Sequence, residues 1–580
     1  MYVDPVLDCA KKYFGLDYLY PMQRLVIANI LEAISGGRDI SSYSLHTHSV
    51  WLDEERDKRD HQLVILPTGA GKSLCFQLPP YFYSGVTVVV YPLISLLNDQ
   101  ARRMASVGLV PLILRGGLSK VDVEHIAHSM QEKKRVVLLT NPEALYMSSL
   151  RKDLSRIHVS HFVIDEAHCI VQWGTTFRKS YLMLPEIIHE CAPKMVTAFT
   201  ATASPAIIDG IRSLLFEDKH MNVVSGNPDR MNIGYAVIPC LHSLVSLLMM
   251  ISVSLKRIQQ GENQTKKEAE KKFWDKIFKK SKSLRGGSQN VYKKWVHQRF
   301  YPRIEVPCII FCPTRNKTEY CAWLLRSTLG YSEIRCYHAG LSREEKKNTE
   351  GWFFASDRGI LCATCAYGMG VDKKNIRTVI HLSPSSTPES YIQEAGRAGR
   401  DKNPAQALLL WDISREWTWE REKKHRIAES FQEIGERKNG ISAKYTLPQT
   451  EKSDTAGHTQ NRFFDIYTRS YGCRRNMLMK HLGADSVFCD NCDLCTGVEF
   501  SIVGVGELYS AVTMNRFDTS GVVKYLCMKN QSNDFLAGSF DQVPSKLMHS
   551  MIDRALSIGM LEQRKMEKGR LFWGFRKKNP

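Results

Sequence analysis

A glycine-rich run between a short apolar strand and a helix constrains the fold of this chain more than any other feature. The run is Leu66-Pro-Thr-Gly-Ala-Gly-Lys-Ser73, and it follows the apolar segment 63–66. Loops of this type surround phosphate oxygens with backbone N–H groups, while the lysine reaches the terminal phosphates and the hydroxyl binds Mg²⁺. The strict pattern has glycine at position 66, so a chance Gly-Lys-Ser turn is the alternative for this run alone. The phosphate-binding roles fall to Thr68, Gly69, Gly71, Lys72 and Ser73.

A pair of carboxylates follows a second apolar strand about ninety residues later. The segment is Ile164-Asp-Glu-Ala-His168, directly after Phe162–Ile164. A strand-terminal aspartate can hold Mg²⁺, and the next glutamate can polarise the attacking water. Together, the glycine-rich run and Asp165 with Glu166 predict Mg²⁺-dependent nucleotide hydrolysis.

Strands that alternate with helical stretches indicate an α/β chain with two parallel sheets. Because functional loops of such sheets lie at the carboxyl ends of the strands, the motifs should gather there. The run Gln393–Arg400 carries an arginine pair, which we expect at the start of a helix and facing the nucleotide. An arginine supplied to the γ-phosphate contributes roughly 10³ to 10⁵ in rate. The predicted strands are 63–66, 86–91, 135–140, 162–164 and 197–203 in the first sheet, then 308–312, 334–338, 359–364 and 378–381 in the second.

Composition narrows the class of protein. The chain has 580 residues, enough for three or four domains, with ordinary hydrophobic and charged content. Its longest apolar stretch, Cys240–Leu255, is interrupted by polar residues, so we expect a packed helix and no membrane span. No signal peptide is visible at the N-terminus, and sixteen cysteines then indicate a reducing, intracellular compartment. The net charge of +19 favours a polyanionic partner, although a merely basic surface is the alternative.

Four cysteines near residue 490 have metal-ligand spacing. Two Cys-x₂-Cys steps share the central cysteine, and a more distant cysteine opens a basic helix at 474–480. Such knuckles suit corners of a tetrahedral Zn²⁺ site. Redox thiols or buried free cysteines are the alternatives, and cysteines within apolar strands, such as Cys308, Cys312 and Cys362, are expected to be core thiols. The predicted zinc ligands are Cys473, Cys489, Cys492 and Cys495.

An aromatic-rich segment, Cys169–Tyr181, directly follows the carboxylate motif. Exposed aromatic rings beside an arginine suit stacking on single-stranded bases. We therefore expect contacts with single-stranded nucleic acid from Trp173, Phe177 and Arg178. A buried aromatic cluster is the structural alternative.

The order of these motifs resembles the RecQ family of ATP-dependent DNA helicases in superfamily two, over nearly the whole chain. Two further segments, Asn227–Ile233 and Ala366–Lys373, closely match sequence motifs of the family. The resemblance implies that Gln23 contacts adenine and that Arg400 is the arginine finger, with the aromatic loop coupling DNA binding to hydrolysis. It also implies that ATP is bound or hydrolysed by Lys72, Ser73, Asp165, Glu166, Arg397 and Arg400.

The chain departs from the family pattern at three places. Val171 stands where serine is usual, Thr175-Thr176 where His-Asp is usual, and Leu19-Tyr20 where Phe-Arg is usual. The first two departures lie within the aromatic loop, so they bear on how strongly DNA stimulates hydrolysis.

The resemblance implies two tandem RecA-like parallel-sheet domains, followed by a helical zinc-binding domain and a winged-helix-like domain. In the tail, 545–556 is predicted as a basic amphipathic helix that leads into a hairpin across 566–570; a generic helical cap is the alternative. Three charged stretches, 41–61, 256–299 and 415–461, are expected to be solvated insertions. An extra nucleic-acid contact is the alternative for the second, in which aromatics interleave with lysines. The predicted domains are 1–226, 227–402, 403–497 and 498–580.

The leading hypothesis is a 3′ to 5′ ATP-dependent DNA helicase, with ATP, Mg²⁺ and structural Zn²⁺ as cofactors. Its partners are single-stranded DNA and duplex junctions, in recombination and repair, and no membrane. One alternative is a DNA-stimulated ATPase that anneals or remodels strands with little unwinding. Another is a non-catalytic DNA-binding module with a decayed motor.

Overall fold

The computed structural model divides the chain into two units, each built on one parallel sheet. Unit 1 comprises Met1–Arg230 with Gly368–Asp372 and Leu478–Val487, and unit 2 comprises the other residues. The structure describes residues 4–35, 61–67, 69–174, 178–218, 220–260, 302–368, 373–413, 456–498, 544–557, 561–565 and 571–575.

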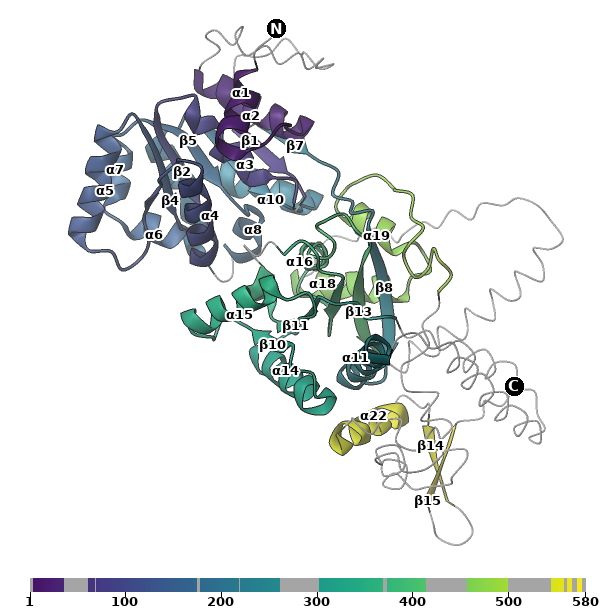
Figure 1. The fold of residues 1–580 in the computed structure, drawn as a ribbon. Coiled ribbons are helices and arrows are strands. Elements are labelled where there is room, and N and C mark those ends of the chain that lie inside the picture. The colour runs from purple at the N-terminus through teal and green to yellow at the C-terminus, as the bar shows by residue number, and fades with distance from the viewer. Residues whose placement is uncertain are drawn as a thin grey trace, which may run out of the picture. The chain divides into compact units, whose positions relative to one another are not determined.

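Unit 1 contains a seven-stranded sheet in the order β3-β4-β2-β5-β6-β1-β7, and its paired strands are parallel (Figure 1). Its strands are β1 (His61–Ile65), β2 (Gly85–Val90), β3 (Leu112–Ile113), β4 (Arg135–Thr140), β5 (Val159–Ile164), β6 (Met195–Thr200) and β7 (Met221–Ser225). Its helices are α1 (Pro5–Phe14), α2 (Pro21–Ser35), α3 (Lys72–Gln77), α4 (Ile94–Ser106), α5 (Lys120–Glu132), α6 (Pro142–Met147), α7 (Leu150–Leu154), α8 (His168–Trp173), α9 (Leu184–Cys191) and α10 (Pro205–Phe216), with 3₁₀ turns at Pro79–Tyr81 and Lys179–Met183.

Alternate residues of the central strands explain why helices cover both faces of this sheet. In β2, Val88 and Val90 join one hydrophobic cluster with helices α5 to α10, whereas Val89 joins a second cluster with α2, α3 and α4. A continuous β-branched run is typical of a parallel strand that is buried on both faces. The strands predicted in this unit are confirmed, with ends that agree or are shifted by up to three residues.

Unit 2 contains a six-stranded parallel sheet in the order β10-β11-β9-β12-β13-β8 and a separate two-stranded hairpin. Its strands are β8 (Ile233–Cys240), β9 (Cys308–Phe311), β10 (Ile334–Tyr337), β11 (Ile360–Ala363), β12 (Thr378–His381), β13 (Ala405–Asp412), β14 (Leu561–Lys565) and β15 (Leu571–Phe575). Its helices are α11 (Ser243–Gln260), α14 (Arg315–Leu329), α15 (Arg343–Ala355), α16 (Pro388–Ala395), α18 (Ala456–Arg469) and α22 (Ser545–Ser557), with a 3₁₀ turn at Cys365–Gly368. Helix α19 (Arg474–His481) begins in this unit, and its residues from Leu478 onward belong to unit 1. The α/β prediction of two RecA-like parallel-sheet domains is confirmed.

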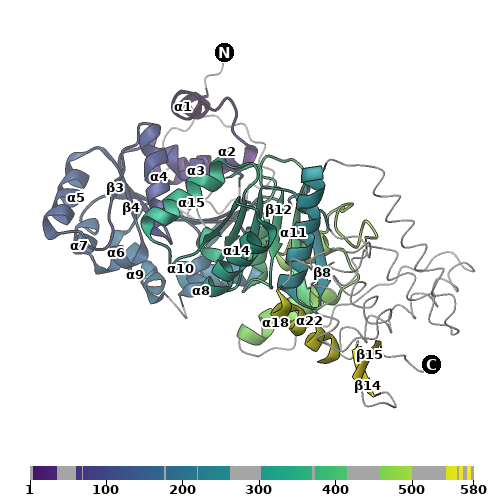
Figure 2. The ribbon, with the colours of Figure 1, turned by 60° about the horizontal axis from the view of Figure 1, so that its bottom comes forward.

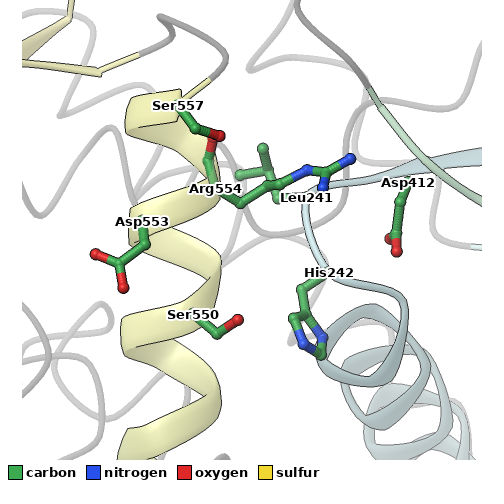
Figure 3. Close-up of a pocket in the computed structure, with 7 residues that line it drawn as sticks. All are labelled: Leu241, His242, Asp412, Ser550, Asp553, Arg554 and Ser557. Atoms are coloured by element: carbon green, nitrogen blue, oxygen red, sulfur yellow. The ribbon is translucent and has the colours of Figure 1, made fainter.

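Helices α11, α14 and α22 share one hydrophobic core with the second sheet (Figure 2). All side chains of α11 from Val245 to Ile251 are buried, so its apolar sequence reflects burial on all sides, as predicted for a packed helix. Helix α22 contributes Met548, Met551 and Ile552 to this core, and Arg554 donates a hydrogen bond to the carbonyl of Ile413 at 2.9 Å. Figure 3 shows the surface pocket at this junction, lined by Leu241, His242, Asp412, Ser550, Asp553, Arg554 and Ser557.

The tail prediction is confirmed for helix α22 and for the hairpin β14–β15. The winged-helix assignment itself stays a prediction, because 499–543 lies outside the described residues. Most of the three predicted insertions also lies outside them, although His61 begins β1 and residues 256–260 end α11. Within the described ranges, no helix combines the length and apolar character needed to cross a membrane.

Candidate nucleotide-binding site and cysteine cluster

The phosphate loop connects β1 to α3 in unit 1. Gly69 and Gly71 adopt left-handed backbone conformations, with φ of 89° and 77°, which favour glycine. The Nζ atom of Lys72 donates to the carbonyl of Leu66 at 3.3 Å, so the lysine folds back across its own loop. Ser73 follows in the first turn of α3, while Thr68 lies outside the described residues. A short glycine loop that leads into Lys72, the first residue of α3, is therefore present at the carboxyl edge of the sheet.

Gln23 lies against this loop from α2. Its Nε2 atom donates to the carbonyl of Ala70 at 3.0 Å, and its Oε1 atom accepts from the N–H of Tyr20 at 2.9 Å. A Cβ atom at Gly71 would lie 2.3 Å from Gln23 Nε2, so only glycine fits here. Gln23 is buried, and its amide ties the residues before α2 to the phosphate loop.

Asp165 and Glu166 follow β5 directly, in the same unit as the phosphate loop. Glu166 has φ of 52°, a left-handed conformation that is strained for a residue with a side chain, and its N–H donates to Asp165 Oδ1 at 3.0 Å. The Glu166 carboxylate lies 3.4 Å from His168 Nδ1, and that nitrogen is also 3.0 Å from the Thr200 hydroxyl. The turn thus places both carboxylates at the end of a central strand. His168 connects the Glu166 carboxylate to Thr200 of β6.

Asp165 is a buried carboxylate with little charge compensation. Burial, followed by the neighbouring Glu166, raises the pKa of Asp165 to about 7, while Lys72 opposes the shift. A buried carboxylate in this state is stabilised by a divalent cation, and oxygen ligands are those that Mg²⁺ prefers. The residues present therefore fit a Mg²⁺ site.

The aromatic loop is partly packed in unit 1. Trp173 is half-buried, and Tyr181 is buried in an edge-to-face contact with it at 6.5 Å between ring centroids. The Arg178 guanidinium lies 5.7 Å from the Trp173 ring centroid and forms a bidentate ion pair with Glu143 at 2.8 and 2.6 Å. It also donates to the carbonyl of Pro92. Arg178 therefore joins three segments of the unit.

The predicted DNA-binding role of this loop stays a prediction. Thr175, Thr176 and Phe177 lie outside the described residues. The contacts of Trp173 and Arg178 are compatible with the packed-cluster alternative, and a DNA contact through Arg178 would compete with Glu143.

The arginine pair of unit 2 lies after a helix, so its predicted position at a helix start is wrong. Helix α16 ends at Ala395, and the residues to Arg400 form turns. Gly399 has φ of 55°, and its carbonyl accepts from Asn232 Nδ2 at 2.8 Å, which fixes this turn to the residues before β8. Gly399 permits this reversal because its left-handed conformation favours glycine, whereas Gly396 caps α16 in a right-handed conformation. Arg397 is buried and Arg400 is half-buried.

The four predicted zinc ligands come together in unit 2. The Sγ atoms of Cys473, Cys489, Cys492 and Cys495 all lie within 4.8 Å of one another, and those of Cys473 and Cys492 are 4.0 Å apart. A tetrahedral site with Zn–S bonds near 2.3 Å requires sulfur atoms roughly 3.8 Å apart. The geometry therefore fits Zn²⁺. By contrast, Cys308, Cys312 and Cys362 are buried in the sheet core, as predicted.

Residues around the cysteines attach the cluster to edge strand β8. Asp493 accepts from the N–H of Val237 at 3.0 Å and forms a buried ion pair with Arg474 at 3.2 Å. The Arg475 guanidinium donates to the carbonyls of Met231 and Ile233 at 2.9 and 2.8 Å. These bonds use backbone groups at the free edge of the sheet.

Sequence reasoning did not single out Glu143, Thr200 or Asp493 as individual residues. Glu143 follows β4 in an Asn-Pro-Glu run, and Thr200 ends β6, so both had the signal of a polar residue at a strand end. Asp493 lies between two predicted ligands, where its spacing carries no signal for a partner in β8.

Comparisons with known proteins agree with these two units. Residues 20–209 match the DEAD/DEAH box helicase family, and residues 296–402 match the helicase conserved C-terminal domain. Among curated relatives, the chain is 29% identical to the ATP-dependent DNA helicase RecQ of Pasteurella multocida over 75% of this chain and 57% of that protein. It is 30% identical to the probable ATP-dependent DNA helicase RecS of Bacillus subtilis over 60% of each.

A third relative is the mouse bifunctional 3′-5′ exonuclease/ATP-dependent helicase WRN, at 31% identity over 70% of this chain and 24% of that protein. The chain thus spans about three fifths or less of the length of these relatives.

Proposed function

We propose that this chain, a member of the RecQ-related DEAD/DEAH box helicases, hydrolyses ATP to move 3′ to 5′ along one DNA strand and to unwind duplex or branched DNA. The similar proteins named RecQ and RecS are described as ATP-dependent DNA helicases, which supports DNA as the partner. A role in recombination and repair and an intracellular site of action belong to the same proposal.

One observation carries the hydrolytic part of this proposal. The lysine of a glycine loop and two strand-terminal carboxylates occur at the same edge of one parallel sheet, and Lys72 is close enough to Asp165 to oppose the rise in its pKa. Such a combination provides both a phosphate ligand and an acceptor for the proton of a water.

Each side chain then has a distinct role in ATP hydrolysis. When ATP binds, Lys72 Nζ gives up its hydrogen bond to the Leu66 carbonyl and contacts phosphate oxygens instead. The backbone N–H groups at Thr68, Gly69 and Gly71 bind the remaining phosphate oxygens. Glu166 orients the attacking water, with His168 holding its carboxylate. Gln23 contacts the base while its amide stays attached to the loop.

Mg²⁺, when bound, neutralises phosphate charge and orients the phosphates for attack. Ser73 and Asp165 are the side chains that would hold it. Arg397 and Arg400 are proposed to stabilise the negative charge that develops on the γ-phosphate, with Arg400 as the arginine finger.

The cysteine cluster is proposed to bind structural Zn²⁺ and so to keep residues 473–495 attached to β8. Zinc contributes roughly 10–16 kcal/mol to the folding of small finger domains, so Cys492→Ser should release the metal and give poorly soluble protein. Metal analysis of the purified protein tests this. Absence of stoichiometric zinc from the wild type would contradict it.

Steady-state ATP hydrolysis with and without single-stranded DNA tests the proposed activity. We expect DNA to stimulate the wild type, and we expect Glu166→Gln to abolish turnover while ATP still binds, because the amide cannot accept a proton. Turnover that persists in Glu166→Gln would contradict the assigned role. Absence of turnover in the wild type would favour a DNA-binding module with a decayed motor.

A further inference from the structure

The outward face of helix α14 in unit 2 presents two aromatic side chains to solvent. Tyr320 is 40% exposed and Trp323 is 55% exposed, and their rings are stacked with centroids 5.7 Å apart at 29° between planes. The opposite face of the helix buries its apolar side chains, among them Cys321 and Leu325, in the sheet core. The rotation of α14 is therefore fixed, and the stacked pair is displayed as a preformed surface.

Basic residues flank the aromatic pair along the same helix. With 3.6 residues per turn, Lys317 lies about one turn before Tyr320, and Arg326 lies about one turn after Trp323. Both are exposed, and no ion pair among the described residues occupies either of them. The nearby carboxylate of Glu319 lies 2.9 Å from His338 Nε2. The face thus combines ring surfaces with cations on both flanks.

These features favour one kind of occupant. A stable contact with a second copy of the chain requires about 800 Å² of complementary surface on each partner, and two side chains between basic flanks are too small and too highly charged for that. Single-stranded nucleic acid offers unpaired bases for the rings and phosphates for the cations.

We propose that the outward face of α14 binds single-stranded DNA, with Tyr320 and Trp323 stacking on unpaired bases and with Lys317 and Arg326 contacting phosphates. The inference rests on the proposed DNA helicase function. It adds a DNA contact in unit 2 that is separate from the aromatic loop of unit 1.

Fluorescence anisotropy with a labelled oligothymidylate tests this contact in the full-length protein. We expect the Tyr320→Ala/Trp323→Ala double variant to bind about tenfold more weakly or worse, because loss of one stacked base lowers affinity roughly fivefold or more and the variant removes two rings. Tyr320→Phe/Trp323→Phe keeps both ring surfaces and should retain most of the affinity. Lys317→Ala/Arg326→Ala should reduce the salt dependence of binding.

Phe354→Ala is the matched control, because Phe354 is an aromatic residue of the same unit that is 66% exposed on α15. It should bind DNA as the wild type does, and thermal melting of every variant checks that the fold is kept. Wild-type affinity in the folded double variant would overturn the α14 inference alone. A double variant that changes only the oligomeric state would identify a protein contact and would also overturn it. A wild type that binds no oligonucleotide would overturn the proposed function together with this inference.

Discussion

The two units bury aspartates in opposite ways. In unit 1, Asp165 is buried beside a second carboxylate, and its pKa is raised to about 7. In unit 2, Asp493 is equally buried, but it pairs with Arg474 and accepts from the N–H groups of Val237 and Leu494. A buried charge without a nearby opposite charge indicates a ligand-binding site. A buried charge that is paired with an opposite charge indicates a contact that holds parts of the fold together. The comparison separates functional from structural residues within one chain.

The largest effect on activity is expected from Lys72→Ala in unit 1. Loss of the phosphate-binding cation should lower ATP turnover roughly 10³-fold or more, the order found for a charge-stabilising arginine finger. Stability should remain, because the hydrogen bond that the structure records for Nζ is to one carbonyl, that of Leu66. Much of the DNA binding should also remain, because the proposed DNA contacts are made by other residues. Parallel assays of ATP turnover and DNA binding check this.

Lys194→Ala is the matched control for that substitution, since Lys194 Nζ likewise donates to a backbone carbonyl, that of Ile34, at 3.0 Å. It should retain turnover. Equal loss of DNA binding in Lys72→Ala would mean that DNA affinity depends on the phosphate site more than we propose.

A large loss of stability is expected from Asp493→Ala in unit 2. Removal of one partner of a buried ion pair leaves Arg474 uncompensated and should lower the free energy of unfolding by about 3–5 kcal/mol. Denaturant unfolding measures this. Asp490→Ala, in an exposed neighbour within the cysteine cluster, should stay within about 0.5 kcal/mol of the wild type. A similar loss of unfolding free energy in Asp493→Ala and Asp490→Ala would contradict the structural role that distinguishes Asp493 from Asp165.

Asp165→Asn should have the opposite sign, because it removes a buried charge that lacks compensation. We expect a gain in stability of about 1–3 kcal/mol at pH 8, together with loss of ATP turnover. The pKa of Asp165 is higher in the folded than in the unfolded state, so its ionised form destabilises the fold above about pH 7. The gain should therefore shrink as the pH falls from 7 toward the ordinary value for aspartate. Thermal melting at pH 8 and pH 5 tests this, and a loss of stability at pH 8 would contradict it.

The smallest effects are expected in the aromatic loop. Trp173→Ala should reduce DNA-stimulated turnover several-fold, because one stacking surface is lost. Thr175→His with Thr176→Asp restores the family residues and should raise the stimulation, since a threonine hydroxyl is shorter and carries no charge. The ratio of turnover with and without DNA is the measurement. An unchanged ratio in Trp173→Ala would identify the loop as the packed cluster that its contact with Tyr181 also permits.

Local patterns were sufficient to predict the strands that are rich in β-branched residues. Strands β4 and β12 have the predicted ends, because each is an apolar run with clear boundaries. Strands β8 and β13 were not predicted, although they pair over eight residues. Gly234 and Pro239 interrupt the strand pattern of β8, and Gln406 and Asp412 are polar positions in β13. The packing of α22 in the second sheet core was also not predicted, since nothing in its amphipathic pattern specifies a partner.

The candidate sites show the same limit. Lys72, Asp165 and the four cysteines were predicted because motif spacing along the chain encodes them. The contacts that orient the sites join distant segments, as Gln23 does with Ala70 and Arg178 with Glu143. Such tertiary pairs depend on the fold, so a single sequence gives the chemical groups but not their partners.

Strand displacement on tailed duplexes tests the central claim most directly. The substrates are a labelled duplex with a 3′ single-stranded tail and the same duplex with a 5′ tail, each with and without ATP. We predict ATP-dependent release of the labelled strand from the 3′-tailed duplex, little release from the 5′-tailed one, and none with Lys72→Ala. ATP turnover without strand release from the 3′-tailed duplex would contradict the proposal and would favour a DNA-stimulated ATPase that anneals or remodels strands.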